Sequence, residues 1–325
     1  MNRSYGVVGS AAIDVYAVSK FFKPQITNRQ QQIVIDHGSQ IWLDNAIQEP
    51  GGGGLLSAMV FARQGEQVSL VTKTGADVFS QVIAKVAQDE SIVLLENHET
   101  TKHHTDTTIH LTSESIDQTI MCYTGSFLSL SKSDCDKLPE GLDWLHIATL
   151  PSEKSTLQYL IKIARKRNIG ISMNPHFVHT LPSRTLLKAL LQCQIAILNR
   201  DEASVLIGTY CSLAQAAQKL SEIGLQHIVV YDNDNGVTVV KNGTMYETGW
   251  NQQAKLIDSS GAEEVFAAGY VYKYLHSDDI NKALTFGLAQ ASSVNLVAGA
   301  RAGILQNPVL EPVKVNQHEL IEEVL

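Results

Sequence analysis

The sequence predicts an α/β fold in which helices cover both faces of a mostly parallel sheet. Hydrophobic residues make up 44% of the 325 residues and charged residues 18%, which is typical of a large buried core and not of extended disorder. Short apolar runs alternate along the chain with segments of helical period, as they do in β-α-β units. The length suits one large domain or two smaller ones.

Short apolar, β-prone runs mark the predicted strands of the main sheet. They are Tyr5 to Val8, Val68 to Thr72, Leu145 to Ala148, Ile169 to Met173, Ile195 to Leu198 and Ile228 to Tyr231.

Between these runs, apolar residues recur at the spacing of a helix face. One predicted face consists of Leu157, Leu160, Ile161 and Ala164, and another of Leu213, Ala216, Ala217, Leu220 and Ile223. The last residues, HELIEEVL, predict a short amphipathic helix.

Two segments, about 14–45 and 95–125, lack a clear helical pattern. The second contains TDTTIHLTSESIDQTIMCY, which is rich in Thr and Ile and is interrupted by polar turn residues. This composition predicts an antiparallel hairpin. The two segments are therefore expected to form a small β layer beside the main sheet.

Bulk composition argues against several classes of partner. The net charge of −8 does not suit a nucleic-acid or membrane-surface binder, which needs a basic face. The four cysteines form no CxxC pair, so they predict reduced thiols and no zinc site. No apolar run is long enough to span a bilayer, and MNRSYGVVGS lacks the apolar core of a signal peptide. We therefore expect a cytoplasmic protein.

Four glycines stand directly before a predicted helix in PGGGGLLSAMVFARQG, residues 50–65. Glycines at a helix start allow a ligand to approach the backbone and its free N–H groups. A plain flexible loop has the same composition, so the motif alone leaves both interpretations open.

Two further positions admit either a structural or a functional interpretation. Asn199 and Glu202 follow an apolar strand at i and i+3, where α/β proteins bind ligands, but the pair also suits a helix N-cap. Asp14 follows the first strand in GSAAID, where it could bind a ligand or form a turn.

The stretch DSSGAEEVFAAG, residues 258–269, predicts a turn that opens an apolar helix. Free N–H groups at a helix start form an anion site. Two carboxylates, Glu263 and Glu264, nevertheless occupy the first turn.

The order of these motifs is more specific than any one of them. A strand followed by GSxxID, then GGxG, TGADVF, NxxE and DxxGA resembles the ribokinase (PfkB-type) family of sugar and nucleoside kinases. The resemblance implies one ribokinase-like domain over residues 1–325, a three-layer α/β/α sandwich with a mostly parallel sheet. A small β-sheet lid would come from about 14–45 and 95–125.

The resemblance also implies a substrate site. The positions that match the family's early Asp and first glycine loop are Asp14, Gly51, Gly52 and Gly54. Leu56 stands where the family has a substrate-binding Asn, and an apolar side chain leaves a buried hydroxyl without a partner, at a cost of about 1–3 kcal/mol. The acceptor therefore differs from a simple ribose-like sugar at that contact, or is absent.

On the nucleotide side, the resemblance implies ATP and Mg²⁺, with the NxxE motif falling on Asn199 and Glu202. Glu202 would reach the magnesium ion through water. The family's TLGxxG loop falls on residues 231–236, where Asn233 and Gly236 are the expected contacts and only the last glycine is kept. A monovalent cation near Asp258 is a further family expectation.

The family's DTxGAGD motif becomes DSSGAEE in this chain. The backbone of Gly261, Ala262 and Glu263 would form the anion hole, and Glu264 would be the catalytic base. Glu264 keeps the carboxylate, but it is one methylene longer than Asp, and a misplacement of about 1 Å can cost about 100-fold in rate. Glu263 either points outward or turns inward and opposes phosphate by its charge.

These residues leave two interpretations open. One is an ATP-dependent phosphotransferase that acts on a hydroxyl of a sugar or nucleoside. The other is a catalytically weak or inactive family member that binds a small molecule or a partner. For either, the resemblance implies a homodimer formed through the lid. A Rossmann oxidoreductase is disfavoured because GVVGSAAID supplies only Gly6 and Gly9 and no GxGxxG.

Overall fold

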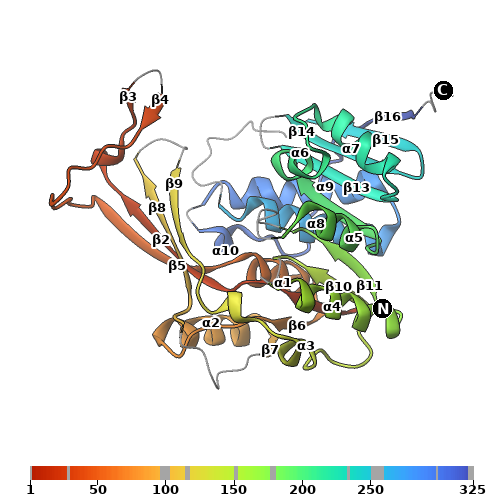
Figure 1. Ribbon diagram of the computed structural model, residues 1–325, viewed down its shortest axis with the longest axis horizontal. Helices are drawn as coiled ribbons and strands as arrows, with labels where there is room; N and C mark the ends of the chain where they lie inside the picture. The colour runs from red at the N-terminus through yellow and green to blue at the C-terminus, as the bar shows by residue number, and fades with distance from the viewer. Residues whose placement is uncertain are drawn as a thin grey trace.

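A large twisted sheet runs through the molecule and carries helices on both faces (Figure 1). The structure is a computed structural model that describes residues 2–27, 30–95, 103–113, 118–149, 153–175, 181–232, 235–249, 260–297 and 299–320. In this part of the chain ten strands form the sheet, in the order β16-β15-β14-β13-β12-β11-β10-β1-β6-β7.

Seven neighbouring strands of this sheet, β13, β12, β11, β10, β1, β6 and β7, are parallel. Strands β14, β15 and β16 extend the sheet beyond β13 as an antiparallel edge. Their bounds are β1 Ser4–Val8, β6 Gln67–Val71, β7 Ile92–Leu95, β10 Trp144–Ile147, β11 Gly170–Met173, β12 Ile195–Asn199, β13 His227–Asp232, β14 Gly236–Lys241, β15 Thr244–Thr248 and β16 Asn316–Glu319.

Two apolar cores, one on each face, hold the layers together. Alternation along β1 sends Tyr5 and Val7 into one core and Val8 into the other. The first core is covered by α1 Gly53–Arg63, α2 Val78–Asp89, α8 Ala262–Ser277, α9 Ile280–Val294 and the short α10 Ala300–Gly303. The second is covered by α3 Lys132–Cys135, α4 Lys154–Lys166, α5 Ser183–Leu190, α6 Arg200–Ile207 and α7 Leu213–Glu222.

A separate four-stranded sheet lies beside the main one, in the order β5-β2-β8-β9 (Figure 1). Its strands are β2 Ala12–Val18, β5 Asn45–Gly51, β8 Asp106–Thr112 and β9 Gln118–Tyr123. The predicted hairpin is confirmed, because β8 and β9 pair antiparallel. Near this sheet lie the 3₁₀ turns η1 Lys20–Phe22 and η2 Phe127–Ser129 and the two-stranded β3 Gln25–Thr27 and β4 Gln30–Gln32.

Two local predictions were wrong. The C-terminal HELIEEVL was expected to be helical, but His318 and Glu319 lie in β16, where the main chain hydrogen-bonds to β15; residues 321–325 lie outside the described part. Ile223 was placed on the buried face of α7, but that helix ends at Glu222 and the Ile223 side chain is exposed.

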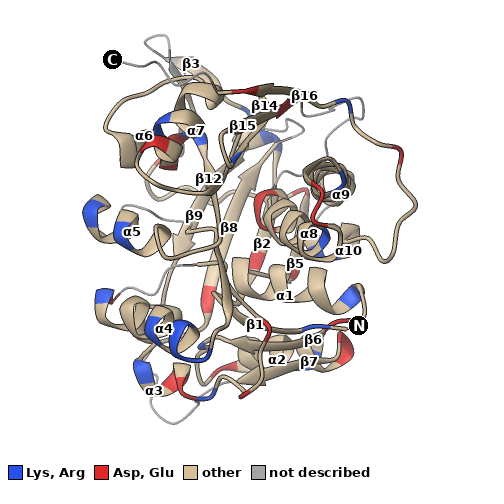
Figure 2. Cartoon of the chain, turned by 90° about the vertical axis from the view of Figure 1, so that its right-hand side faces the viewer, with Lys and Arg blue, Asp and Glu red and all other residues tan. Residues whose placement is uncertain are grey.

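The charges are distributed unevenly over the layers. Figure 2 shows Lys and Arg on α4 and α5, whereas Asp and Glu lie on β2, β5 and the start of α8. No described helix combines the length and the apolar character that crossing a membrane requires. The four cysteines, Cys122, Cys135, Cys193 and Cys211, are free thiols.

Candidate active site

A cavity of about 460 Å³ opens where the starts of α1 and α8 meet the small sheet. Its lining comes from the ends of β1 and β10, from β2, β8 and β9, and from the residues that begin both helices. The predicted site residues in this lining are Asp14, Gly52, Leu56, Gly261, Glu263 and Glu264. The fold thus brings residues from both ends of the chain together at the carboxyl edge of the parallel strands, where α/β proteins bind ligands.

The start of α8 depends on a glycine. Gly261 has φ of 75°, a left-handed conformation that residues with a side chain adopt rarely. A Cβ atom there would lie 2.6 Å from Leu56 Cδ1 and 2.6 Å from Ala300 Cβ. Leu56 therefore packs directly beneath the turn, and the first N–H groups of α8 begin at the cavity that Gly261 lines.

Glu264 lies in the first turn of α8, next to the start of α1. Its side chain is only 8% exposed, and a Cβ atom at Gly53 would lie 3.3 Å from Glu264 Cγ and 2.9 Å from Thr149 Oγ1. The absence of a side chain at Gly53 therefore lets the carboxylate approach the glycine loop. A carboxylate in the first turn is also favoured by the helix dipole.

Glu263 turns toward the main sheet. The hydroxyl of Tyr231, at the end of β13, donates to Glu263 Oε2 at 2.9 Å. Burial raises the pKa of Tyr231 well above its ordinary value, and the charges of Glu263, Glu202 and Glu264 raise it further. Tyr231 therefore stays protonated and donates to Glu263. The hydrogen bond holds the Glu263 carboxylate at the edge of the cavity.

Asp14 belongs to a polar network on the small sheet. Thr108 donates its hydroxyl to Asp14 Oδ1, and the same hydroxyl lies 3.0 Å from His110 Nε2. His110 Nδ1 lies 2.8 Å from Gln118 Oε1 and 3.2 Å from Ser260 Oγ. Because β2 and β8 pair with Asp14 opposite Thr108, the network is set by strand register and reaches the residue before Gly261.

The glycines of the first loop have different surroundings. Gly52, with φ of 92°, and Gly53 line the cavity. A Cβ atom at Gly51 would overlap Asp14 Oδ2, and one at Gly54 would overlap the backbone of Gly9. Gly51 thus makes room for the aspartate side chain, whereas Gly54 allows the close approach of α1 to β1.

Asn199 and Glu202 form a reciprocal capping box at the start of α6. Asn199 Oδ1 accepts from the Glu202 N–H at 2.8 Å, and Glu202 Oε2 accepts from the Asn199 N–H at 3.0 Å. This is the N-cap that the sequence left as one alternative, and Glu202 is buried in it. Asn199 pairs with Tyr231 of the neighbouring strand, and Tyr231 contacts Glu263 of α8, so the motif lies near the start of α8.

The side-chain oxygens of Asn199 and Glu202 are also of the kind that holds a magnesium ion through water. Mg²⁺ prefers oxygen ligands and keeps several waters, so one or two carboxylates beside substrate phosphates suffice. Within the described ranges, no group of three or more His, Cys, Asp or Glu side chains could hold a metal ion by itself. The oxygens of Asn199 and Glu202 suit such a shared, hydrated ion.

The remaining nucleotide-side positions lie partly outside the described residues, which exclude Asn233 and Asp258. Gly236 begins β14 with φ of 99°, and a Cβ atom there would overlap Thr248 O. Its backbone conformation and the close packing of β14 on β15 both require glycine.

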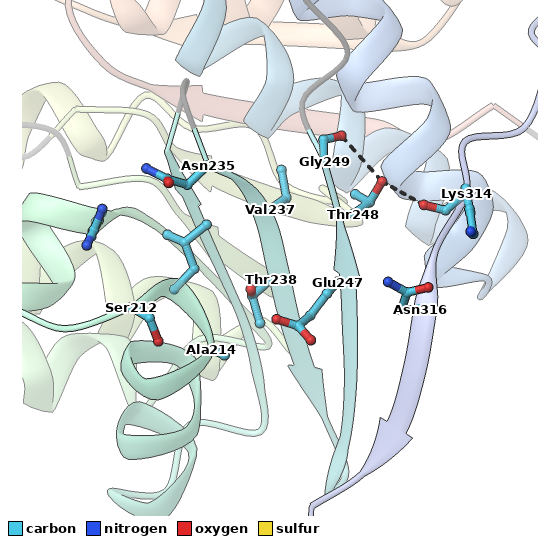
Figure 3. Close-up of a pocket in the computed structure, with 12 residues that line it drawn as sticks. Ser212, Ala214, Asn235, Val237, Thr238, Glu247, Thr248, Gly249, Lys314 and Asn316 are labelled. Atoms are coloured by element: carbon cyan, nitrogen blue, oxygen red, sulfur yellow. Dashed lines mark hydrogen bonds between the residues drawn. The ribbon is translucent and has the colours of Figure 1, made fainter.

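A second cavity, of about 570 Å³, lies between the start of α7 and strands β14 and β15 (Figure 3). Two cationic side chains, Arg200 and Lys314, contribute to its lining, and Arg200 Nη1 lies 3.3 Å from Asp232 Oδ2. As far as the chain is described, it shares no lining residue with the cavity that contains Glu264.

Sequence reasoning missed three polar residues of β8. Asp106, Thr108 and His110 line the cavity and lie two residues apart, so they share one face of the strand. The alternation was visible in TDTTIHLT once the segment was assigned as a strand. Ser10 and Thr149 follow β1 and β10, and their hydroxyl oxygens are 3.3 Å apart. Ser10 belongs to the GSxxID motif but was assigned no role, and Thr149 lies in no motif.

Comparison with known proteins supports the same fold. The model of the pfkB family of carbohydrate kinases matches residues 3–307. A ribokinase of Haemophilus influenzae is 24% identical over 314 residues, which cover 94% of this chain and 96% of that protein. A solved ribokinase of Arabidopsis thaliana, complexed with ribose and ATP, has a TM-score of 0.75 at 19% identity and covers 94% of this chain and 96% of its own.

A nucleoside kinase of Methanocaldococcus jannaschii, described as an archaeal member of the ribokinase family, has a TM-score of 0.70 at 16% identity. The likeness covers 93% of this chain and 94% of that one. These similarities confirm the predicted ribokinase-like fold, with its large, mostly parallel sheet, its helices and its small separate sheet.

Proposed function

The chain belongs to the pfkB family of carbohydrate kinases, and from this premise we propose that it transfers the γ-phosphoryl group of ATP to a hydroxyl group of a sugar or nucleoside. The observation that supports the proposal most directly is the position of Glu264. Its carboxylate lies in the first turn of α8, in one cavity with the glycine loop and Asp14.

In this proposal Asp14 accepts a hydrogen bond from the acceptor's hydroxyl groups and orients them toward α8. Glu264 takes the proton of the reacting hydroxyl while the hydroxyl oxygen forms a bond to the γ-phosphorus. The bond from that phosphorus to the leaving ADP oxygen breaks. The backbone N–H groups of Gly261, Ala262 and Glu263 face the charge on the transferred group. Magnesium, held through water near Asn199 and Glu202, would neutralise phosphate charge.

A weak or inactive member is the second candidate, and the Tyr231–Glu263 hydrogen bond favours it. That bond holds a negative charge beside the helix start, where phosphate charge would have to dock. Two like charges about 4 Å apart repel by about 4 kcal/mol at an effective dielectric near 20. This repulsion lowers ATP affinity unless magnesium or a shift of the side chain relieves it.

We propose further that the small sheet is the lid of this site and pairs with a second copy of the chain. Large apolar side chains stand exposed near it, including Phe21 at 68%, Ile26 at 81% and Trp42 at 76%. Such a patch is typical of an interaction surface. Light scattering of the purified protein tests this: Trp42→Ser is expected to shift a dimer toward monomer.

The experiment that tests the proposed function is product analysis with γ-³²P-labelled ATP, Mg²⁺ and a panel of pentoses, hexoses and nucleosides. Labelled phosphate ester is expected with at least one acceptor, and none without acceptor. Absence of product across the whole panel, with a well-folded protein, would leave the non-catalytic alternative.

A further inference from the structure

The cavity that contains Glu264 has one polar and one apolar wall. Asp14, Thr108 and His110 form the polar wall on β2 and β8, whereas Ile120, Tyr123 and Leu128 form the apolar wall on β9 and η2. We propose that the acceptor is a nucleoside: a hydroxylated ring faces the polar wall and a planar base lies on the apolar one. The inference rests on the proposed function, since it takes the ligand of this cavity to be the phosphoryl acceptor.

The apolar wall is exposed as a ligand-binding surface would be. Ile120 is 49% exposed and Leu128 41% exposed, and both side chains line the cavity. Covering apolar area contributes about 25 cal/mol per Å², and aromatic rings add specific contact energy. A flat heteroaromatic base would cover these side chains, whereas a pentose alone offers mainly hydroxyl groups, which find no partner there.

The apolar wall is also held in place before any ligand binds. Asp106 Oδ1 accepts from the N–H groups of Gly125 at 2.9 Å and Phe127 at 3.2 Å. The Ser126 hydroxyl in the same turn donates to Lys73 O at 2.8 Å. These bonds fix the turn that carries Phe127 and Leu128, so little ordering is required when a base docks.

The size of the cavity and the position of Leu56 agree with this assignment. A volume of about 460 Å³ lies in the range of about 300–1,000 Å³ that is typical of drug-sized ligand sites. Leu56 contributes a further apolar contact beneath Gly261 and is held there by packing. A hydroxyl directed at it would lose its hydrogen bonds, which disfavours acceptors that are polar all round.

Calorimetric titration without ATP tests the inference by binding alone, with adenosine, guanosine, cytidine and uridine compared with ribose and 2-deoxyribose. At least one nucleoside is expected to bind about tenfold or more tightly than either pentose. Pentose binding as tight as that of every nucleoside, or no nucleoside binding at all, would overturn the inference.

The strand β9 supplies a matched pair of variants. Ile120→Asn removes part of the apolar wall and is expected to weaken nucleoside binding about fivefold to tenfold, with pentose binding unchanged. Met121, 48% exposed on the same strand, does not line the cavity, so Met121→Asn is expected to leave both affinities unchanged. Equal effects of the two substitutions would contradict a base-binding role of this wall.

The binding and turnover measurements separate the inference from the proposed function. Phosphorylation of a pentose without nucleoside binding would remove the inference and leave the kinase activity. Nucleoside binding without transfer of labelled phosphate would support the base-binding role of the apolar wall and count against the proposed phosphotransferase function.

A chemical readout is available at Cys122, which lines the cavity and is exposed. Partial burial raises the pKa of the Cys122 thiol, so its alkylation is followed at mildly alkaline pH. Saturating nucleoside is expected to slow alkylation of Cys122, with Cys122→Ser as the blank. An unchanged rate at a nucleoside concentration that titration shows to be saturating would contradict docking on this wall.

Discussion

The hydroxyl of Tyr231 donates to the carboxylate of Glu263 across the gap between β13 and α8, over 2.9 Å. The contact joins the carboxyl end of a central strand to the first turn of the helix that carries Glu264. Because burial and three nearby carboxylates hold the tyrosine protonated, the donor persists at neutral and moderately alkaline pH.

Removing the donor should destabilise the fold. Tyr231→Phe leaves a half-buried carboxylate without this hydrogen bond and is expected to lower the free energy of unfolding by about 1–3 kcal/mol. Tyr5→Phe is the matched control, because the buried Tyr5 hydroxyl has no hydrogen-bond partner among the described residues. Urea denaturation should show a loss for Tyr231→Phe and little change for Tyr5→Phe; equal losses would show that the hydrogen bond to Glu263 does not stabilise the fold.

Neutralising Glu263 should improve nucleotide binding. Glu263→Gln keeps the length of the side chain and an acceptor for Tyr231, but removes a negative charge from the helix start. The affinity for Mg-ATP is expected to rise about tenfold, because a like-charge repulsion disappears. Titration of both proteins measures it, and an unchanged dissociation constant would show that the carboxylate does not oppose phosphate.

A side chain at Gly261 should disturb the turn beneath which Leu56 packs. Gly261→Ala combines strain at positive φ with overlap against Leu56 and is expected to cost about 2–4 kcal/mol. Gly243 has a similar φ of 79° but open space around it, so Gly243→Ala reports the backbone cost alone. Thermal unfolding of the two variants separates these contributions, and equal midpoints would rule out crowding at the helix start.

Acidification should destabilise the protein through two buried histidines. Burial lowers the pKa of His146 and of His227 from 6.5 to about 3, so the folded state leaves both neutral. Below pH 6.5 the unfolded chain takes up protons that the folded chain does not, so the free energy of unfolding falls as pH falls. Between pH 6.5 and 5 the loss is about 2 kcal/mol per histidine.

Urea denaturation at a series of pH values measures this slope. His146→Gln is expected to remove about half of it, whereas substitution of the exposed His37 by Gln should leave it unchanged. A slope that His146→Gln does not alter would place the acid sensitivity elsewhere.

Much of the main sheet could be predicted because its strands are short, buried on both faces and bounded by helices with clear apolar stripes. Along α4, for example, Leu157, Leu160, Ile161 and Ala164 are buried as their spacing predicts. Strand β16 could not be predicted, since its residues are exposed and polar and join the sheet by pairing with β15. Periodicity carries no signal for such an edge strand.

The parts of the candidate site that lie in recognisable motifs could be predicted. The parts that strand pairing brings together could not. The glycine loop and the start of α8 were recognisable from their residues. The approach of Thr108 and His110 to Asp14 depends on the parallel pairing of β8 with β2, which a single sequence does not reveal. The orientation of Glu263 toward Tyr231 likewise required the relative positions of β13 and α8.

We propose that the Glu264 carboxylate takes the proton of the acceptor's hydroxyl during phosphoryl transfer. The most direct test is the rate of labelled phosphate transfer by Glu264→Gln, compared with wild type at saturating ATP and acceptor. We predict a loss of about 10²- to 10⁴-fold in kcat, with the dissociation constant of the acceptor nearly unchanged. Turnover by Glu264→Gln at the wild-type rate would contradict the account.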